Sequence, residues 1–309
     1  MRRFLKCDLP EGIVETHEWE PNCWVNIEHP DQEDIALMLD RFKIPRDFLD
    51  SVSDPDERPR METSGQWTLT IIRIPLHIDN HQPCPYTTVP MGIIVKGEVV
   101  VTVCMHRTAL VPDFINHTRQ RQIKMDTEPD FILRLIYSST FWFLRYLKEI
   151  NDRVVRSSDA MRRSIRNDQL IDLMDTQKVL VYFNTSIKGN ELLIDRVQNV
   201  YEGQCDTELL ENVRVEIRQA ANTVDVYTNI LSGVMDSYAS IISNNVNDIM
   251  RKMTGVSIVL MFPTLIASFY GMNVAIRLSD SPYAFLCIIL GSISISIILY
   301  FILRKIHWL

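Results

Sequence analysis

The sequence has no excess of basic residues: 32 lysines and arginines stand against 39 aspartates and glutamates, giving a formal net charge of −7. A nucleic-acid-binding surface needs a basic excess to neutralise phosphates, so we expect no nucleic-acid partner. An acidic surface attracts divalent cations instead. The sequence also has no P-loop, no G-x-G-x-x-G and no H-E-x-x-H motif, so we expect neither enzyme activity nor an organic cofactor.

The six cysteines have no C-x-x-C pair and no repeated spacing, which argues against a disulfide framework or a zinc ribbon. We therefore expect reduced thiols and a cytosolic compartment for the soluble part. Arg2 and Arg3 are not followed by an apolar stretch, so no signal peptide is expected. His77, His81 and Cys84 have a spacing that a metal could use, but they lie in a proline-rich stretch at the end of a strand, which favours a structural role.

Long apolar runs without charge are confined to the C-terminal part, at residues 254–270 and 283–303. A helix needs about 20 apolar residues to cross the hydrocarbon core of a bilayer, so both runs are predicted to be transmembrane helices. Another apolar run, 131–147, contains Arg134 and Arg145. Each of these charges costs roughly 2.5–3.5 kcal/mol at the centre of a membrane helix, so a buried helix of the soluble part is predicted there.

Basic residues flank both outer ends of this pair of spans: Arg251, Lys252, Arg304 and Lys305. The linking loop, 271–282, is neutral overall. The positive-inside rule then predicts that both termini are cytoplasmic and that the loop is extracytoplasmic. We expect a multi-pass protein of the inner (plasma) membrane, embedded in the lipid bilayer, with a basic cytosolic tail at 304–309.

The N-terminal part is predicted to be soluble, with a cytosolic α/β domain at 1–128. Strands are predicted at 67–74, 91–95 and 99–104, the last two joined by a turn at 96–98, and helices at 35–42 and 112–122. Residues 129–205 are predicted to form cytosolic antiparallel helices with a polar turn near Asn167.

A heptad pattern follows, in which apolar residues recur in alternating steps of four and three over Val213, Ile217, Ala220, Val224, Tyr227, Leu231, Val234, Tyr238 and Ile241. This pattern is typical of a helix that packs along its length against partners. No strong stop separates it from the first span, so residues 206–270 are predicted to form one stalk and membrane helix, roughly 95 Å long. A helix of that length implies a stalk within an oligomer.

A polar stripe runs through the first span, with each member polar, small or thioether: Asn247, Met250, Thr254, Ser257, Met261, Thr264 and Ser268. Such a stripe must face another helix or water. One interpretation is contact between helices, where Ser and Thr commonly pack. The other is a pore wall without fixed charge, suited to a hydrated Mg²⁺ ion because this ion loses its waters reluctantly, with Met250 and Met261 as apolar constrictions.

The outer end of the first span reads Tyr270-Gly271-Met272-Asn273 and resembles the Tyr-Gly-Met-Asn signature of the CorA family of magnesium channels. Further segments are similar to the family's N-terminal domain, its stalk and its basic tail: 57–60, 225–227, 232–233, 235–238, 243–247 and 304–309. The resemblance covers nearly the whole chain and is densest over 222–273.

This resemblance implies an α+β membrane protein that forms a funnel-shaped homopentamer, with a cytosolic α/β domain, a long stalk helix continuous with the first transmembrane helix, and a second transmembrane helix at the C-terminus. It implies a selectivity entrance at Gly271, Met272 and Asn273, in which the Asn273 amides form the metal-binding ring. The implied pore positions are Asn247, Met250, Met253, Thr254, Ser257, Met261, Thr264 and Ser268. Magnesium is then both transported and regulatory, and Asp236 is the candidate regulatory ligand.

The loop departs from the family pattern, since 274–280 contains Arg277 and lacks the acidic stretch that many members have. Two alternatives to a passive magnesium channel therefore stay open. One is a transporter of the same fold for zinc, cobalt or nickel, although Met272 favours magnesium. The other is a membrane-anchored cytosolic sensor without transport.

Overall fold

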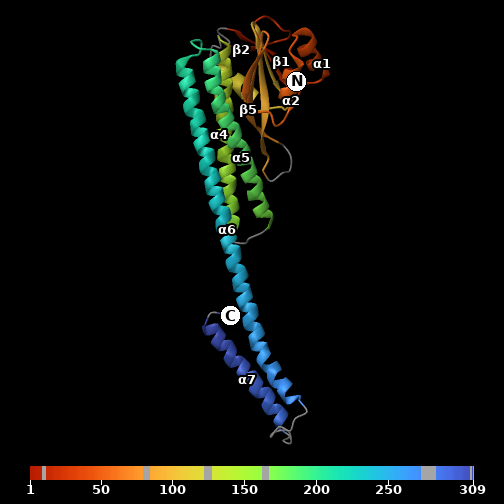
Figure 1. Ribbon diagram of the computed structural model, residues 1–309, viewed down its shortest axis with the longest axis vertical. Helices are drawn as coiled ribbons and strands as arrows, with labels where there is room; N and C mark the ends of the chain where they lie inside the picture. The colour runs from red at the N-terminus through yellow and green to blue at the C-terminus, as the bar shows by residue number, and fades with distance from the viewer. Residues whose placement is uncertain are drawn as a thin grey trace. The chain divides into compact units, whose positions relative to one another are not determined.

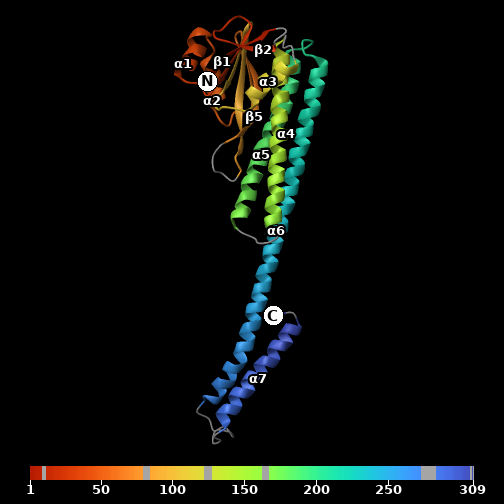
Figure 2. The same ribbon diagram turned by 180° about the vertical axis from the view of Figure 1, so that it is seen from behind.

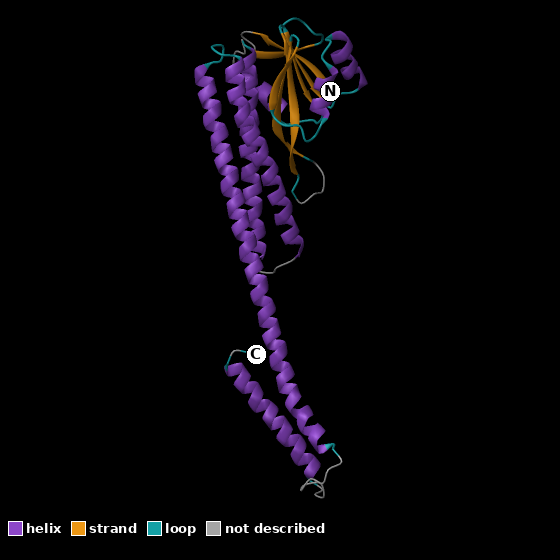
Figure 3. Cartoon of the chain, in the orientation of Figure 1, coloured by secondary structure: helices purple, strands orange, loops and turns teal. Residues whose placement is uncertain are grey.

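The computed structural model describes residues 1–8, 12–78, 84–121, 127–161, 167–272, 283–306 and 308. The chain divides into two units, Met1–Gly233 and Val234–Leu309. The first contains a sheet with helices on both faces, and the second contains two helices (Figures 1 and 3).

A mixed seven-stranded sheet organises the first unit, in the order β2-β1-β3-β7-β6-β5-β4. β3 and β7 pair in parallel, and the other neighbouring strands pair antiparallel. The central strands read as nearly continuous apolar runs because both of their faces are covered. The bounds are β1 (Arg2–Asp8), β2 (Gly12–Thr16), β3 (Cys23–Glu28), β4 (Arg60–Ser64), β5 (Trp67–His77), β6 (Tyr86–Lys96) and β7 (Val99–Cys104).

The helices form two layers, one on each side of the sheet (Figures 1 and 2). One layer holds α1 (Gln32–Ala36), the π-helical turn η1 (Leu37–Arg41) and α2 (Arg46–Ser53). The other layer holds α3 (Leu110–Arg121), α4 (Glu128–Met161) and α5 (Asn167–Val200).

The alternation of side chains along β3 shows how one strand serves both layers. Val25 and Ile27 belong to the apolar core beneath α2. Trp24 points the other way, and its ring lies 5.7 Å from Phe114 of α3 and 5.2 Å from Phe131 of α4. The apolar run 131–147 is a largely buried part of α4, which confirms the prediction that it belongs to the soluble part.

Gly92 lets α2 approach the sheet closely. It sits in the middle of β6, and a Cβ atom there would overlap the Val52 side chain of α2. Gly97 has a different role, since it adopts a φ of +55° in the turn between β6 and β7, a conformation that favours glycine.

An asparagine side chain hydrogen-bonds to the backbone of β5 in the part of the strand that extends beyond β4. β4 begins at Arg60, opposite Ile71, so the backbone of Arg73 has no strand on that side. The Arg73 N–H donates to Asn190 Oδ1 at 2.9 Å, and Asn190 Nδ2 donates to the Arg73 carbonyl at 2.7 Å. Asn190 of α5 is 1% exposed, so this amide satisfies backbone groups that water does not reach.

α6 (Thr207–Tyr270) is one helix, and most of its heptad residues up to Leu231 are buried within the single chain. Polar contacts show that α5 runs antiparallel beside it: Arg214 donates to Asp195 at 2.7 Å, and Asn184 donates to Asp225 at 2.7 Å. This part of the heptad pattern is therefore covered by the same chain and carries no argument for an oligomer.

Candidate functional site

Among the residues that the structure describes, two helices are long and apolar enough to cross a membrane: α6, through its C-terminal part, and α7 (Ala284–Lys305). Only 6% of the most apolar window of each is buried within the chain, unlike the core helix of a soluble protein. The predicted second span, 283–303, coincides with α7 within two residues. Figure 3 shows the two helices of this unit side by side.

The face of α6 that contacts α7 is small and apolar. Gly255 is buried, and Val259, Pro263 and Ile266 are half-buried on the same side of the helix. With 3.6 residues per turn, the polar stripe (Asn247, Met250, Thr254, Ser257, Met261, Thr264 and Ser268) lies on roughly the opposite side. Every member of the stripe is exposed in the single chain.

At the contact between the two helices, a side chain of α7 replaces a backbone hydrogen bond that α6 lacks. Pro263 has no N–H, so the carbonyl of Val259, four residues earlier, loses its usual partner. Ser296 Oγ of α7 lies 3.3 Å from that oxygen and 3.1 Å from the Ser292 carbonyl of its own helix. In a bilayer, where water cannot satisfy a freed carbonyl, this hydroxyl provides the substitute donor.

The hydroxyls of the stripe use their hydrogens within α6. Ser257 donates to the Met253 carbonyl and Thr264 donates to the Leu260 carbonyl, each at 2.9 Å. The oxygen lone pairs remain free to accept hydrogen bonds from outside the helix. The stripe thus presents acceptors, which suit the outward-pointing hydrogens of water bound to a cation.

Three methionines accompany the hydroxyls. Met250 and Met261 lie on the stripe and are each 61% exposed. Met253, also expected to line a pore, is 66% exposed but lies roughly 70° around the helix from the centre of the stripe.

The C-terminal end of α6 holds the start of the Tyr-Gly-Met-Asn segment. The Gly271 N–H donates to the Ala267 carbonyl at 2.9 Å, and Met272 is 55% exposed. A Cβ atom on Gly271 would lie 3.4 Å from the Ala267 oxygen, which is an ordinary contact, and Gly271 has no positive φ, so the backbone geometry does not require glycine at this position. Asn273 and Arg277 lie outside the described residues.

Asp236, the candidate regulatory ligand, is exposed on α6, and no contact to its carboxylate is found among the described residues. No group of three His, Cys, Asp or Glu side chains that could hold a metal occurs in the described part of the chain. Cys84 is buried and His77 packs against the ring of Tyr86 at 5.2 Å, while His81 lies outside the described residues.

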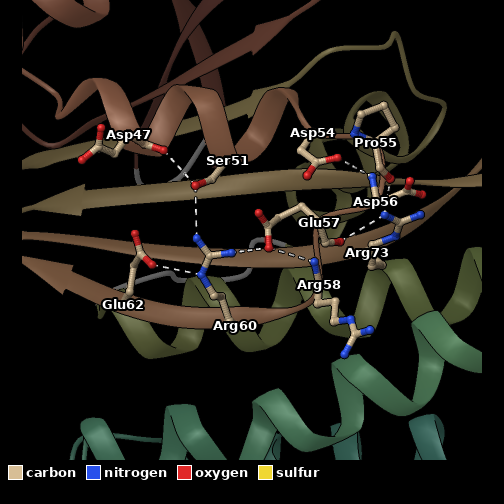
Figure 4. A network of polar contacts seen from close by, with 10 residues as sticks. All are labelled: Asp47, Ser51, Asp54, Pro55, Asp56, Glu57, Arg58, Arg60, Glu62 and Arg73. Carbon is tan, nitrogen blue, oxygen red and sulfur yellow. Dashed lines mark hydrogen bonds and ion pairs between the residues drawn. The ribbon is translucent and has the colours of Figure 1, made fainter.

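The Glu57–Arg60 segment forms a structural network at the start of β4 (Figure 4). Arg60 pairs with Glu57, donates to Glu62 Oε2 at 3.0 Å and donates to Ser51 Oγ of α2 at 3.1 Å. This network ties the loop that precedes β4 to α2.

Arg73 of β5 also holds the loop that precedes β4, through hydrogen bonds from its guanidinium. Its guanidinium donates to the carbonyls of Pro55 at 2.5 Å, Glu57 at 3.1 Å and Thr88 at 2.8 Å, and also to the Thr88 hydroxyl at 2.8 Å. Burial lowers the pKa of Arg73, and the nearby carboxylates of Asp56 and Asp54 oppose that shift. The network therefore gives this segment a role in rigidity, which the sequence pattern alone did not reveal.

The fold and the stripe define a protein with a soluble α/β unit and two membrane-length helices, the first of which has a polar face turned away from the second. The sequence matches the model of the family described as CorA-like Mg²⁺ transporter protein over residues 19–305. The chain therefore belongs to this family of membrane transporters, as the resemblance implied.

Individual members of this family are similar to the chain both in sequence and in structure. The cobalt/magnesium transport protein CorA of Methanocaldococcus jannaschii is 22% identical over 293 residues, covering 93% of this chain and 91% of the relative. The complete structure of the CorA magnesium transporter from that organism matches 100% of this chain and 99% of its own, with a TM-score of 0.83 and 20% identity. The CorA of Thermotoga maritima is 33% identical over 94 residues, which cover 29% of this chain and 26% of the relative.

Proposed function

We propose that the chain forms a passive, potential-driven channel for hydrated Mg²⁺, in which several copies of α6 surround a common axis. The observation that carries this proposal is the position of the polar stripe, exposed on the side of α6 opposite α7. If α7 packs outside and α6 inside, the same geometry turns every stripe toward the axis. The homopentamer that the family resemblance implies is the arrangement we adopt.

The chemistry of the stripe suits an ion that keeps its water. Magnesium dehydrates reluctantly, and its bound waters donate hydrogen bonds outward. The hydroxyls of Ser257 and Thr264 and the amide of Asn247 offer acceptors to those waters, and Met250 and Met261 supply apolar constrictions. Moving two positive charges inward yields about 4.6 kcal/mol per 100 mV, so no ATP hydrolysis is required.

Fixed charges stay off the stripe. By helical geometry Arg251 lies about 90° from the centre of the stripe, and Asp248 and Lys252 lie roughly opposite. Selection of the ion is then assigned to the entrance at Asn273, whose amide oxygens from neighbouring copies would form a ring around the hydrated ion.

Gating by intracellular Mg²⁺ is the second part of the proposal. Asp236 would contribute one carboxylate, and the other ligands would come from a neighbouring copy, because a single chain offers no metal site among its described residues. Asp236→Asn is then expected to leave flux intact and to weaken its inhibition by internal Mg²⁺. If internal Mg²⁺ inhibits flux through Asp236→Asn as strongly as through the wild type, Asp236 is not a ligand of the regulatory ion.

Cysteine accessibility tests the orientation of α6. In a background without the native cysteines, we expect Ser257→Cys and Thr264→Cys to react with a charged, water-soluble methanethiosulfonate reagent and to lose flux on reaction. Val256→Cys and Leu260→Cys are the matched controls, since both side chains are exposed in the single chain but lie well off the stripe. Equal protection of all four positions, or block only at the controls, would contradict a pore lined by the stripe.

Cobalt is the alternative ion with a specific observation behind it, because two relatives are named cobalt/magnesium transport proteins. Flux of Co²⁺, Ni²⁺ or Zn²⁺ in preference to Mg²⁺ in the same liposomes would favour a transporter of another ion with the same fold. Absence of flux for all of these ions would favour the membrane-anchored sensor.

A further inference from the structure

The hydrogen bond from Ser296 of α7 to the Val259 carbonyl of α6 differs in kind from its neighbours on the same face. Gly255, Pro263 and Ile266, which are buried or half-buried on that side of α6, have no side-chain group that donates or accepts a hydrogen bond. Apolar contacts are non-directional, so they hold two helices together but define the rotation of each about its own axis only loosely. A hydrogen bond weakens steeply as its angle changes, so it defines that rotation more sharply.

The position of Pro263 determines which carbonyl needs this bond. Proline has no N–H, so the carbonyl four residues earlier, that of Val259, is without its helical partner. Val259 is half-buried on the side of α6 toward α7, roughly opposite the polar stripe. If α6 turned about its axis in a bilayer, this carbonyl would move away from Ser296 toward lipid, which offers no donor. The freed carbonyl therefore favours the rotation in which the stripe faces away from α7.

The Ser296 hydroxyl has a second acceptor within its own helix. Its oxygen lies 3.3 Å from the Val259 carbonyl and 3.1 Å from the Ser292 carbonyl, and a hydroxyl donates only one hydrogen. If α6 turned, the hydroxyl would keep Ser292 as its acceptor, whereas the Val259 carbonyl would lose its donor. The free-energy cost of turning thus falls on α6, the helix that carries the stripe.

We infer that Ser296 is a positioning residue for ion conduction: its hydrogen bond holds α6 in the rotation that turns the polar stripe toward the pore axis. The inference rests on the proposed function, because this rotation affects the ion only if the stripe lines a pore. Ser296 itself contacts the side of α6 opposite the stripe, so it acts through α6 and does not touch the ion.

Cysteine accessibility on the two flanks of the stripe measures the rotation. Ile258 and Leu260 lie about 70° and 90° from the centre of the stripe, one on each side. In the background without native cysteines, we expect Ile258→Cys and Leu260→Cys to react slowly with the charged methanethiosulfonate reagent, because each faces the pore only when α6 turns. Ser296→Ala should raise the rate at one of these two positions by about three- to twentyfold, the effect of losing one hydrogen bond between membrane helices, with the oligomeric state unchanged.

Three variants separate positioning from a general loss of stability. Ser296→Thr keeps a hydroxyl and should restore the wild-type rates. Ser294→Ala, whose hydroxyl bonds to the Leu290 carbonyl within α7, should leave the rates unchanged. Pro263→Ala returns a backbone N–H to the Val259 carbonyl, so Ser296→Ala should no longer raise the rate in that background.

The inference is overturned if Ser296→Ala leaves both flanking rates at their wild-type values, if Ser296→Thr reacts as Ser296→Ala does, or if Ser296→Ala has the same effect in the Pro263→Ala background. Equal acceleration at Ile297→Cys, which is exposed on α7, would indicate a loosening of both helices and would also overturn it. Failure of the proposed function gives a different result: Ser257→Cys and Thr264→Cys are then protected in the wild type, which conducts no ion, and the inference fails with it.

Discussion

Replacement of Asn190 by alanine isolates one interaction that holds α5 to the sheet. The side chain makes two hydrogen bonds to the Arg73 backbone, at 2.9 and 2.7 Å, in a region where Asn190 itself is 1% exposed. Alanine removes both hydrogen bonds, so the Arg73 N–H loses its acceptor and the Arg73 C=O loses one of its two donors. The Ser139 hydroxyl still reaches the Arg73 carbonyl at 3.2 Å, so the N–H is the group left fully without a partner.

The magnitude follows from this asymmetry. A net hydrogen bond contributes about 1 kcal/mol, and an orphaned buried backbone group costs about 1–3 kcal/mol. One orphaned N–H and one weakened carbonyl therefore lower the free energy of unfolding of the first unit by about 2–4 kcal/mol. For a unit of this size, each kcal/mol corresponds to a fall in Tm of roughly 2–4 °C.

Hydrogen exchange of the intact protein in detergent measures the effect locally. We expect the peptide that spans β5 to exchange faster by a factor of ten or more in Asn190→Ala, together with a lower Tm by tryptophan fluorescence. Asn199→Ala is the control, because Asn199 is exposed on the same helix. If the β5 peptide exchanges in Asn190→Ala at the wild-type rate, the Asn190 side chain does not take the place of a neighbouring strand.

Three further substitutions test other parts of the account. Gly92→Ala is expected to destabilise the first unit by about 1–3 kcal/mol through overlap with α2, and adding Val52→Ala should recover part of the loss; thermal unfolding that shows no recovery would contradict that contact. Ser296→Ala should lower the stability of the membrane helices in a denaturant titration by about 0.6–1.7 kcal/mol, whereas Ser294→Ala, whose hydroxyl bonds only within α7, should be close to neutral. Asn273→Ala should abolish Mg²⁺ uptake with assembly intact, and unchanged uptake would refute the entrance ring.

The strands β5, β6 and β7 were predictable from sequence because each is a run of β-branched and apolar residues buried on both faces. β1 was not, since its sequence is rich in charge and only a few of its residues reach the core. α2 was also missed, because a short helix with three buried residues among polar ones gives a weak pattern. Gly92 was an available signal, since a glycine within an apolar strand often marks a close approach of another element.

The candidate site likewise has features that the sequence predicts and features that it does not. The polar stripe was predictable because membrane helices are apolar and a row of hydroxyls stands out at helical spacing. The substitution of Ser296 for the missing N–H of Pro263 was not, because the partners are 33 residues apart and meet only through helix packing.

Magnesium influx into proteoliposomes that contain the purified protein and a magnesium-sensitive dye tests the central claim most directly. The account predicts influx driven by an inside-negative potential, faster for Mg²⁺ than for Co²⁺ or Zn²⁺, and lost on charged modification of Thr264→Cys. Liposomes that conduct none of these ions, under conditions in which an established magnesium channel conducts, would contradict the claim that the stripe of α6 lines a pore.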